Sequence, residues 1–150
     1  MITLSFDEEW PYANGSHTIT VPIRVENLPY WVPAILDTGA SVTYLDNALL
    51  PHLHIADVRA GPSIPVTVAN GEQGTAFLHS LRIEVFNRQL SIQAAFCPDW
   101  PPGTKNLLGM RGFFEQILVA FDHGIRRLYY TIPARPLVWA SSASGLVPPV

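Results

Sequence analysis

Three consecutive residues, Asp37, Thr38 and Gly39, have the side chains and spacing best suited to chemistry in this 150-residue chain. They follow the apolar run 32–36, and a buried strand rarely ends on an unpaired carboxylate because desolvating that group is costly. Hydrogen bonds or a shared proton must therefore hold Asp37 there. Two neighbouring carboxylates that share one proton can hydrolyse a peptide bond, since one takes a proton from water while the other protonates the amide.

The tripeptide occurs only once. Asp122 also has a glycine two residues later, but His123 stands where the hydroxyl residue would be needed. A two-fold axis beside Asp37 would place the same carboxylate opposite itself, so a homodimer supplies the missing half of such a site. The alternative for Asp37 is a carboxylate that caps its own turn, as in many Asp-x-Gly sequences.

The elements that position these residues are predicted to be strands. Fourteen prolines and ten glycines divide the chain into short pieces rich in β-branched and aromatic residues, which is typical of an all-β domain. We expect strands over residues 2–6, 18–26, 31–36, 42–45, 64–69, 73–86, 90–96, 117–121 and 127–132. We also expect two short helices, one running from the N-cap Asp46 through Leu50 and one over residues 111–116.

Asn70-Gly71 is the strongest turn signal and predicts a two-residue type I′ hairpin, because both central positions need positive φ. Asn87-Arg88 and residues 122–124 are weaker turn candidates. Residues 1–132 are expected to form one domain. Residues 133–150 are rich in proline and small residues, which predicts an extended or disordered tail or a segment lying along another chain.

Residues 35–41 resemble the active-site loop of aspartic proteases, and Ala40 after the glycine makes the loop similar to the retroviral type. Two further motifs follow in the order found in that family. The hairpin at residues 69–71 resembles the flap, and residues 107–109 resemble the segment that packs beneath the catalytic loop. Over residues 15–132 the chain therefore resembles single-domain retropepsin-like aspartic proteases of bacteria.

This resemblance implies a closed β-barrel of the retropepsin-like acid protease fold and a homodimeric aspartic-type endopeptidase without cofactor or metal. The substrate would be a peptide or protein bound in extended conformation under the flap. The residues that the resemblance assigns to catalysis are Asp37, Thr38 and Gly39. Those assigned to substrate binding are Ala40, Ser41, Ala69, Asn70 and Gly71, and those assigned to support of the catalytic loop are Leu107, Leu108 and Gly109.

The chain departs from the retroviral pattern at two places. Met110 separates Gly109 from Arg111, so the ion-pairing role of the retroviral arginine is not transferred, and the proline-rich tail leaves the mode of dimerisation open. Two alternatives remain. One is a dimeric module that keeps this fold and binds peptides or proteins without cutting them, and the other is the protease domain of a larger regulatory chain.

Composition excludes several other classes. The net charge of −3 and the absence of a basic run longer than Arg126-Arg127 disfavour nucleic-acid binding. The low charged fraction of 14% predicts an apolar surface, as in an oligomer or a covered peptide groove. One cysteine, Cys97, cannot form an intramolecular disulfide, and no signal peptide or membrane-spanning run is visible, so we expect a soluble cytoplasmic protein. His52 and His54 have no ligand partner at metal-binding spacing.

Overall fold

The computed structural model describes residues 1, 3–12, 17–67 and 71–133. These residues form strands and three short 3₁₀-helices, and none of the described helices is long and apolar enough to cross a membrane. The predicted all-β class is confirmed. The proposed tail at residues 133–150 falls outside the described part apart from its first residue.

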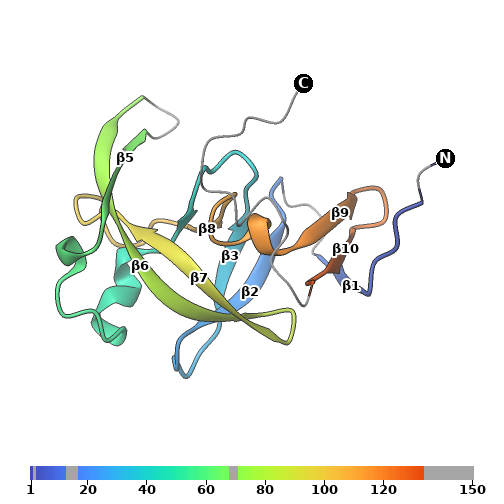
Figure 1. Ribbon diagram of the computed structural model, residues 1–150, viewed down its shortest axis with the longest axis horizontal. Helices are drawn as coiled ribbons and strands as arrows, with labels where there is room; N and C mark the ends of the chain where they lie inside the picture. Colours follow the sequence, from blue (N-terminus) through green and yellow to red (C-terminus); the bar gives the residue numbers. More distant parts are fainter. Residues whose placement is uncertain (2, 13–16, 68–70, 134–150) are drawn as a thin grey trace.

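Six strands close into a barrel (Figure 1). In spatial order they are β2 (Thr20–Val25), β3 (Val32–Leu36), β8 (Asn106–Leu108), β4 (Thr43–Tyr44), β7 (Arg88–Phe96) and β6 (Gln73–Val85). Pairing of β2 with β6 closes the ring, as expected for the predicted barrel. Strand β5 (Ser63–Thr67) pairs with the first part of β6, and the two rise from the barrel as a hairpin.

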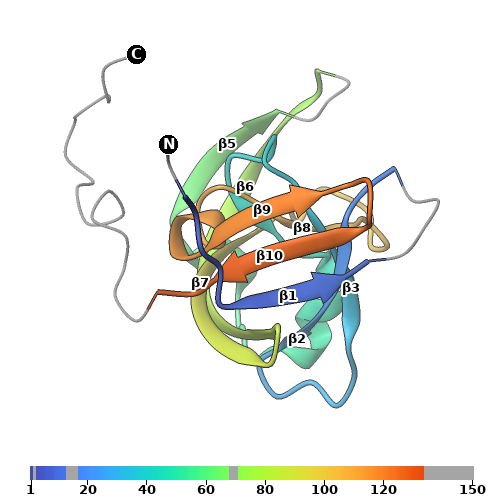
Figure 2. The ribbon, with the colours of Figure 1, turned by 90° about the vertical axis from the view of Figure 1, so that its right-hand side faces the viewer.

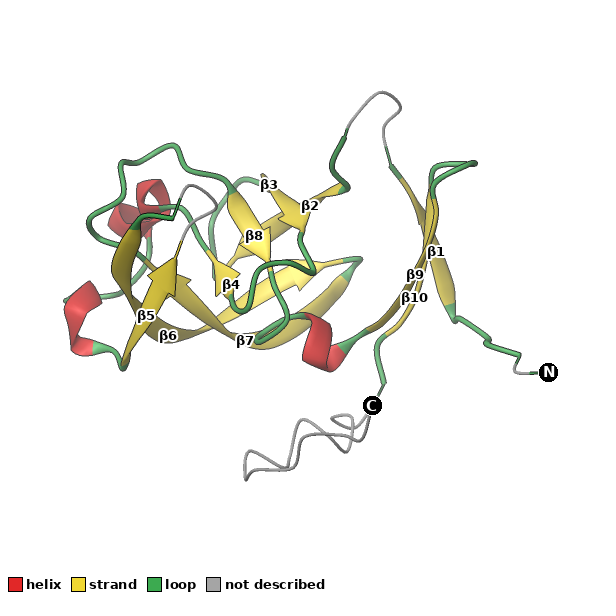
Figure 3. Ribbon diagram, turned by 90° about the horizontal axis from the view of Figure 1, so that it is seen from above, coloured by secondary structure: helices red, strands yellow, loops and turns green. Residues whose placement is uncertain are grey.

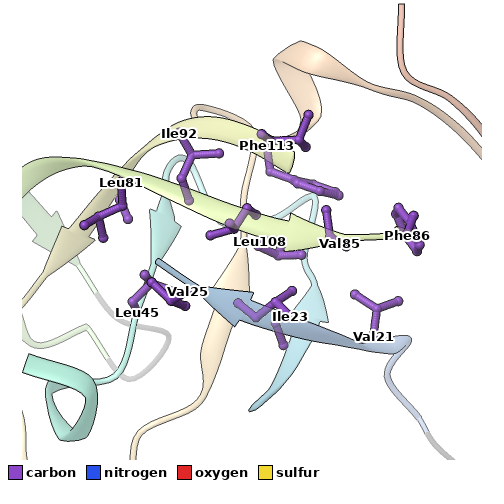
Figure 4. Close-up of a cluster of buried hydrophobic side chains, with 14 of the residues drawn as sticks. Val21, Ile23, Val25, Leu45, Leu81, Val85, Phe86, Ile92, Leu108 and Phe113 are labelled. Atoms are coloured by element: carbon purple, nitrogen blue, oxygen red, sulfur yellow. The ribbon is translucent and has the colours of Figure 1, made fainter. Parts of the chain in front are cut away.

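The barrel core is built by alternation along the strands. Three side chains of β2, Val21, Ile23 and Val25, are buried while their neighbours are exposed or half-buried, because successive side chains of a strand point to opposite faces. Figure 4 shows these side chains facing β6, and Leu81 and Val85 of β6, Ile92 of β7, Leu108 and Phe113 belong to the same buried cluster. Leu108 therefore ties β8 to the core from the strand that lies next to the predicted site.

A second sheet lies beside the barrel and consists of β1 (Glu8–Pro11), β10 (Arg127–Thr131) and β9 (Leu118–Asp122), in that order (Figures 2 and 3). Aromatic rings join it to the barrel: Tyr130 stacks on Phe86 at 4.4 Å between centroids, and Trp10 meets Phe86 edge-on at 5.6 Å. The Tyr130 hydroxyl donates to Glu8 at 2.7 Å. One edge of β9 has no strand partner among the described residues.

Most predicted strands agree with the structure within two residues at each described end, but two assignments were wrong. The strand expected at residues 2–6 is absent from its described part, residues 3–6, and the first strand lies instead at Glu8–Pro11. Pairing with β10 and ion pairs of Glu8 and Glu9 with arginines select that later segment. Strand β8 was not predicted as a strand, because its three residues form one only through long-range pairing with β3 and β4.

The helix η1 (Asn47–His52) begins after Asp46, whose side chain accepts a hydrogen bond from the Ala48 amide as predicted, although the helix is of the 3₁₀ type. The helix predicted at residues 111–116 is reduced to η3 (Phe114–Gln116), because the backbone of Arg111 instead pairs with Val42 and Thr43. A third short helix, η2 (Val58–Ala60), was not predicted and is capped by Asp57.

The β6–β7 turn has its two positive-φ residues at Phe86 and Asn87, one position earlier than predicted. The predicted turn at residues 122–124 begins at Asp122, which closes β9. At the hairpin tip, Ala69 and Asn70 lie outside the described residues. Gly71 has φ +86°, in agreement with the positive φ expected there.

Candidate active site

Asp37 directly follows β3 and is held in place by its own backbone. Its amide donates to the Leu108 carbonyl at 3.0 Å, which continues the parallel pairing of Ile35 with Leu107 by one more step. The side-chain Oδ1 accepts a hydrogen bond from the Gly39 amide at 2.9 Å, and the Asp37 carbonyl accepts one from Ala40 at 3.1 Å. A half-buried carboxylate thus sits in a tight turn at the end of a barrel strand.

Gly39 permits this turn. A Cβ at that position would lie 3.1 Å from Asp37 Oδ1, which is tighter than nine in ten such contacts in proteins. This close approach agrees with the reason that the sequence suggested for the glycine. Thr38 and Gly39 are exposed in the single chain, so nothing within the described part of one copy covers the outer side of the turn.

The segment after β8 passes directly behind the loop and continues from residues 107–109, to which the resemblance assigns the support of the loop. The Met110 amide donates to the Ala40 carbonyl at 2.9 Å, and the Arg111 amide donates to the Ser41 carbonyl at 3.1 Å. These two bonds clamp the part of the loop that follows Gly39. The clamp explains how a short loop can hold a carboxylate at a fixed place on the barrel rim.

Gly109 lies at the closest point of this crossing. Its amide donates to the buried Thr43 Oγ1 at 3.1 Å, and an added Cβ would lie only 2.1 Å from the Val42 carbonyl oxygen and 2.8 Å from that of Ala40. A side chain at residue 109 therefore requires the two segments to move apart. The φ of Gly109 is not positive, so glycine is needed here for the close approach of the two backbones and not for a left-handed conformation.

Asp37 opens into a hollow of about 340 Å³, called the Asp37 hollow below. Its lining residues come from the loop, the segment beneath it and the hairpin: Asp37, Gly39, Ala40, Ser41, Tyr44, Thr67, Trp100 and Leu107. An adjoining hollow of about 430 Å³, the Thr38 hollow, shares Asp37 and Leu107 with the first and adds Thr38 and Phe121. Of the predicted support residues, Leu107 thus lines both hollows while Leu108 is buried in the core.

Two aromatic residues in the wall of the Asp37 hollow were not predicted. The rings of Tyr44 and Trp100 lie 5.7 Å apart, and Ser41 forms a side-chain hydrogen bond with Tyr44. Burial raises the pKa of Tyr44, so this side chain stays neutral and can donate. Trp100 lies in the loop between β7 and β8, and the strands predicted from the sequence do not indicate where such a loop packs.

The β5–β6 hairpin also contributes to the wall of the Asp37 hollow. Thr67, the last described residue of β5, lines the hollow, and its neighbour Val66 pairs with Gly74 on β6. A Cβ on Gly74 would lie 3.8 Å from the Trp100 ring nitrogen, so the base of the hairpin packs against Trp100. Thr67 is thus the residue of β5 that lines the hollow, and the predicted tip residues Ala69 and Asn70 lie outside the described part.

A second Asp-x-Gly turn, at Asp122, allows a comparison with the turn at Asp37. Its Oδ1 accepts a hydrogen bond from the Gly124 amide at 3.1 Å, the same arrangement as in the Asp37 turn. Asp122 lines neither hollow beside Asp37. What distinguishes Asp37 is therefore its attachment to β8 and its place in the hollow.

In the described part of one chain, Asp37 is the only carboxylate that lines either of these hollows. No group of three or more His, Cys, Asp or Glu side chains is placed to hold a metal ion among those residues. A reaction that needs two carboxylates thus has one of them here.

Residues 21–115 match the sequence model of a family described as gag-polyprotein putative aspartyl protease. The match includes the loop around Asp37, the β5–β6 hairpin and the segment at residues 107–109. A search of curated proteins gives no match for this chain.

Proposed function

Because the chain belongs to the gag-polyprotein aspartyl protease family, we propose that it is an aspartic endopeptidase whose active site contains Asp37 from each of two identical chains. The observation that carries the proposal is the position of Asp37. Its carboxylate accepts a hydrogen bond from the Gly39 amide, and its backbone amide donates to the Leu108 carbonyl. The residue opens into a hollow bordered by the hairpin.

In the proposed reaction two Asp37 carboxylates lie on either side of the two-fold axis and share one proton, because two adjacent negative charges repel. The ionised carboxylate takes a proton from a water molecule, which attacks the carbonyl carbon of the peptide bond. The protonated carboxylate donates to the leaving nitrogen. Thr38 is proposed to brace the two loops across the axis with its hydroxyl group.

An exposed aromatic side chain supports a dimer on this face. Phe121 on β9 is 42% exposed. Phe121 lines the Thr38 hollow together with Asp37 and Thr38. A second copy placed here would cover these residues and bring its own Asp37 to the site, so dimerisation and chemistry would use one surface.

An extended peptide is the proposed substrate. The hairpin β5–β6 would close over it, with Gly71 at the tip and Thr67 at the wall, and backbone hydrogen bonds would hold it as an added strand. Ala40 and Ser41 would contact it from below. We assign the protease to residues 1–132.

The test compares two isosteric substitutions in Asp-x-Gly turns. Asp37→Asn should lower cleavage of an unfolded protein substrate at mildly acid pH by at least about 10³-fold, since both proton transfers need the carboxylate. Asp122→Asn, which changes the same kind of turn outside the Asp37 hollow, should cleave like the wild type. Gel filtration of all three proteins should give the same dimer.

Cleavage that survives Asp37→Asn would refute the proposal, and so would a chain that is monomeric at every active concentration. A dimer that binds unfolded peptides through this face but never cleaves them would instead support the peptide-binding module.

A further inference from the structure

Lys105 lines a hollow on the outer face of β2 and β3 that the proposed chemistry does not use. This Lys105 hollow has a volume of about 560 Å³. Its walls come from β2, β3, η1 and the loop before β8, and Thr20, Val32, Ile35, Asp46 and Gly103 are among the residues that line it.

The Lys105 hollow lies next to the Asp37 hollow on the outer face of the barrel. Ile35 lines the first and Leu107 lines the second, and these two residues are neighbours in the parallel pair of β3 and β8. The two hollows together are called the groove below.

Strand register gives the length of this groove. Ile35 lies beside Leu107 in the parallel pair, and alternation places Asp37 two residues beyond Ile35 and Lys105 two residues before Leu107 on the same face. Four residues of strand separate the two ends, which is about 13 Å at roughly 3.3 Å per residue. An extended peptide covers that distance with about four residues.

Lys105 is the only lysine of the sequence. Every arginine that the structure describes has an ion-pair or hydrogen-bond partner: Arg24, Arg59, Arg82, Arg88, Arg111, Arg126 and Arg127. Lys105 has no such partner among the described residues, and its side chain is exposed. Its ammonium group is therefore available to a ligand.

The other charged residue of the Lys105 hollow, Asp46, is already occupied. Its carboxylate accepts hydrogen bonds from the Ala48 amide at 2.9 Å and from the Gly103 amide at 3.0 Å. These bonds keep Asp46 directed at the backbone, and no ion pair joins it to Lys105 in the described structure. The hollow thus offers apolar walls, formed in part by Ile35 and Val32, and one unpaired positive charge.

We propose that Lys105 selects an acidic side chain of the bound peptide, within about four residues of the bond that is cut. A glutamate side chain fits this hollow because its methylene groups contact the apolar wall while its carboxylate pairs with the ammonium group. This inference deepens the proposed function and rests on it, because it takes a peptide that is bound and cut at Asp37.

The experiment uses peptide pairs that differ only by Glu or Gln, placed in turn at each of four positions on either side of the cleaved bond. The assay pH of about 6 keeps the glutamate ionised. At low salt the wild-type dimer should cleave the Glu peptide about fivefold better at one position, which is the ratio expected for one exposed ion pair of about 1 kcal/mol. This preference should shrink between about 0.02 and 0.3 M salt.

Lys105→Met should bring the Glu-to-Gln ratio to one, and Lys105→Glu should invert it, each ratio being measured with the two peptides on the same variant. Arg82→Met is the matched control, because it removes a positive charge whose side chain lines none of the three hollows. It should keep the wild-type ratio.

The same pairs are also measured as binding affinities on Asp37→Asn, so that the two proposals can fail separately. Cleavage without any Lys105-dependent Glu preference overturns this inference alone. A Lys105-dependent preference in binding by a chain that never cleaves overturns the proposed function alone. A Glu preference that Arg82→Met lowers as much as Lys105→Met also refutes the role of Lys105, since it would then reflect net charge.

Discussion

Replacing Gly109 by alanine should separate the loop that carries Asp37 from the segment that supports it. The new Cβ would lie 2.1 Å from the Val42 carbonyl oxygen, whereas real Cβ atoms essentially never come closer than 3.0 Å to such an atom. The two backbones must therefore move apart by roughly 1 Å. Neither neighbour is the end of a flexible side chain, so no rotamer change can relieve the contact.

The cost follows from the bonds that cross this contact. A 1 Å separation breaks the hydrogen bond from Met110 to Ala40, now 2.9 Å, and weakens that from Gly109 to Thr43 Oγ1, now 3.1 Å. One broken bond, one weakened bond and the groups they leave poorly paired cost about 3 kcal/mol. For a domain of this size that lowers Tm by about 10 °C. The displaced Asp37 should also reduce kcat/KM by about 10²-fold.

Gly74→Ala is the matched control, because the nearest neighbours of its Cβ would be Val66 Cγ2 at 3.6 Å and Trp100 Nε1 at 3.8 Å, both ordinary contacts. Its Tm should stay close to that of the wild type. Thr43→Val removes only the acceptor of the Gly109 amide and should cost about 1–2 kcal/mol. If Gly109→Ala melts and cleaves like Gly74→Ala, the support assigned to residues 107–109 is refuted.

Three further predictions test the assembly, a charged contact and the thiol. Wild-type chains mixed with a ninefold excess of Asp37→Asn chains should retain about one tenth of their cleavage after subunit exchange, because mass action leaves few wild-type pairs; undiminished cleavage would mean that one chain suffices. Hydrogen bonds from Tyr130 and Arg88 lower the pKa of Glu8 in the folded protein. The stability that these bonds provide is therefore present above the pKa of Glu8 in the unfolded chain, about 4.5, and is lost as the pH falls through the lower pKa of the folded state. Between about pH 7 and pH 3 the Tm of Tyr130→Phe should therefore fall less than the Tm of the wild type. Curves of Tm against pH that run parallel for the two proteins would contradict this. Burial raises the pKa of the Cys97 thiol to about 11, so iodoacetamide at about pH 8 should label the native protein far more slowly than the unfolded one, with equal rates counting against the burial.

Local sequence determined the parts of this protein that depend on neighbours in the chain. Alternating apolar residues fixed most strands, and Asp46 fixed the start of η1, because a side chain that caps the next turn needs no distant partner. The turn at Asp37 was also readable, since Gly39 stands two residues away and its amide donates a hydrogen bond to the Asp37 carboxylate.

Contacts between distant segments determined the rest. β8 is a strand because it lies between β3 and β4, and β1 occupies Glu8–Pro11 because β10 pairs with that segment. The walls of the groove, Trp100 and Lys105 among them, lie in or beside loops whose positions depend on these pairings. Neither periodicity nor turn signals encode pairing between residues about 70 positions apart, such as Ile35 and Leu107. The tripeptide was therefore visible in the sequence, but the groove around it exists only because the barrel closes and brings β8 beneath the loop.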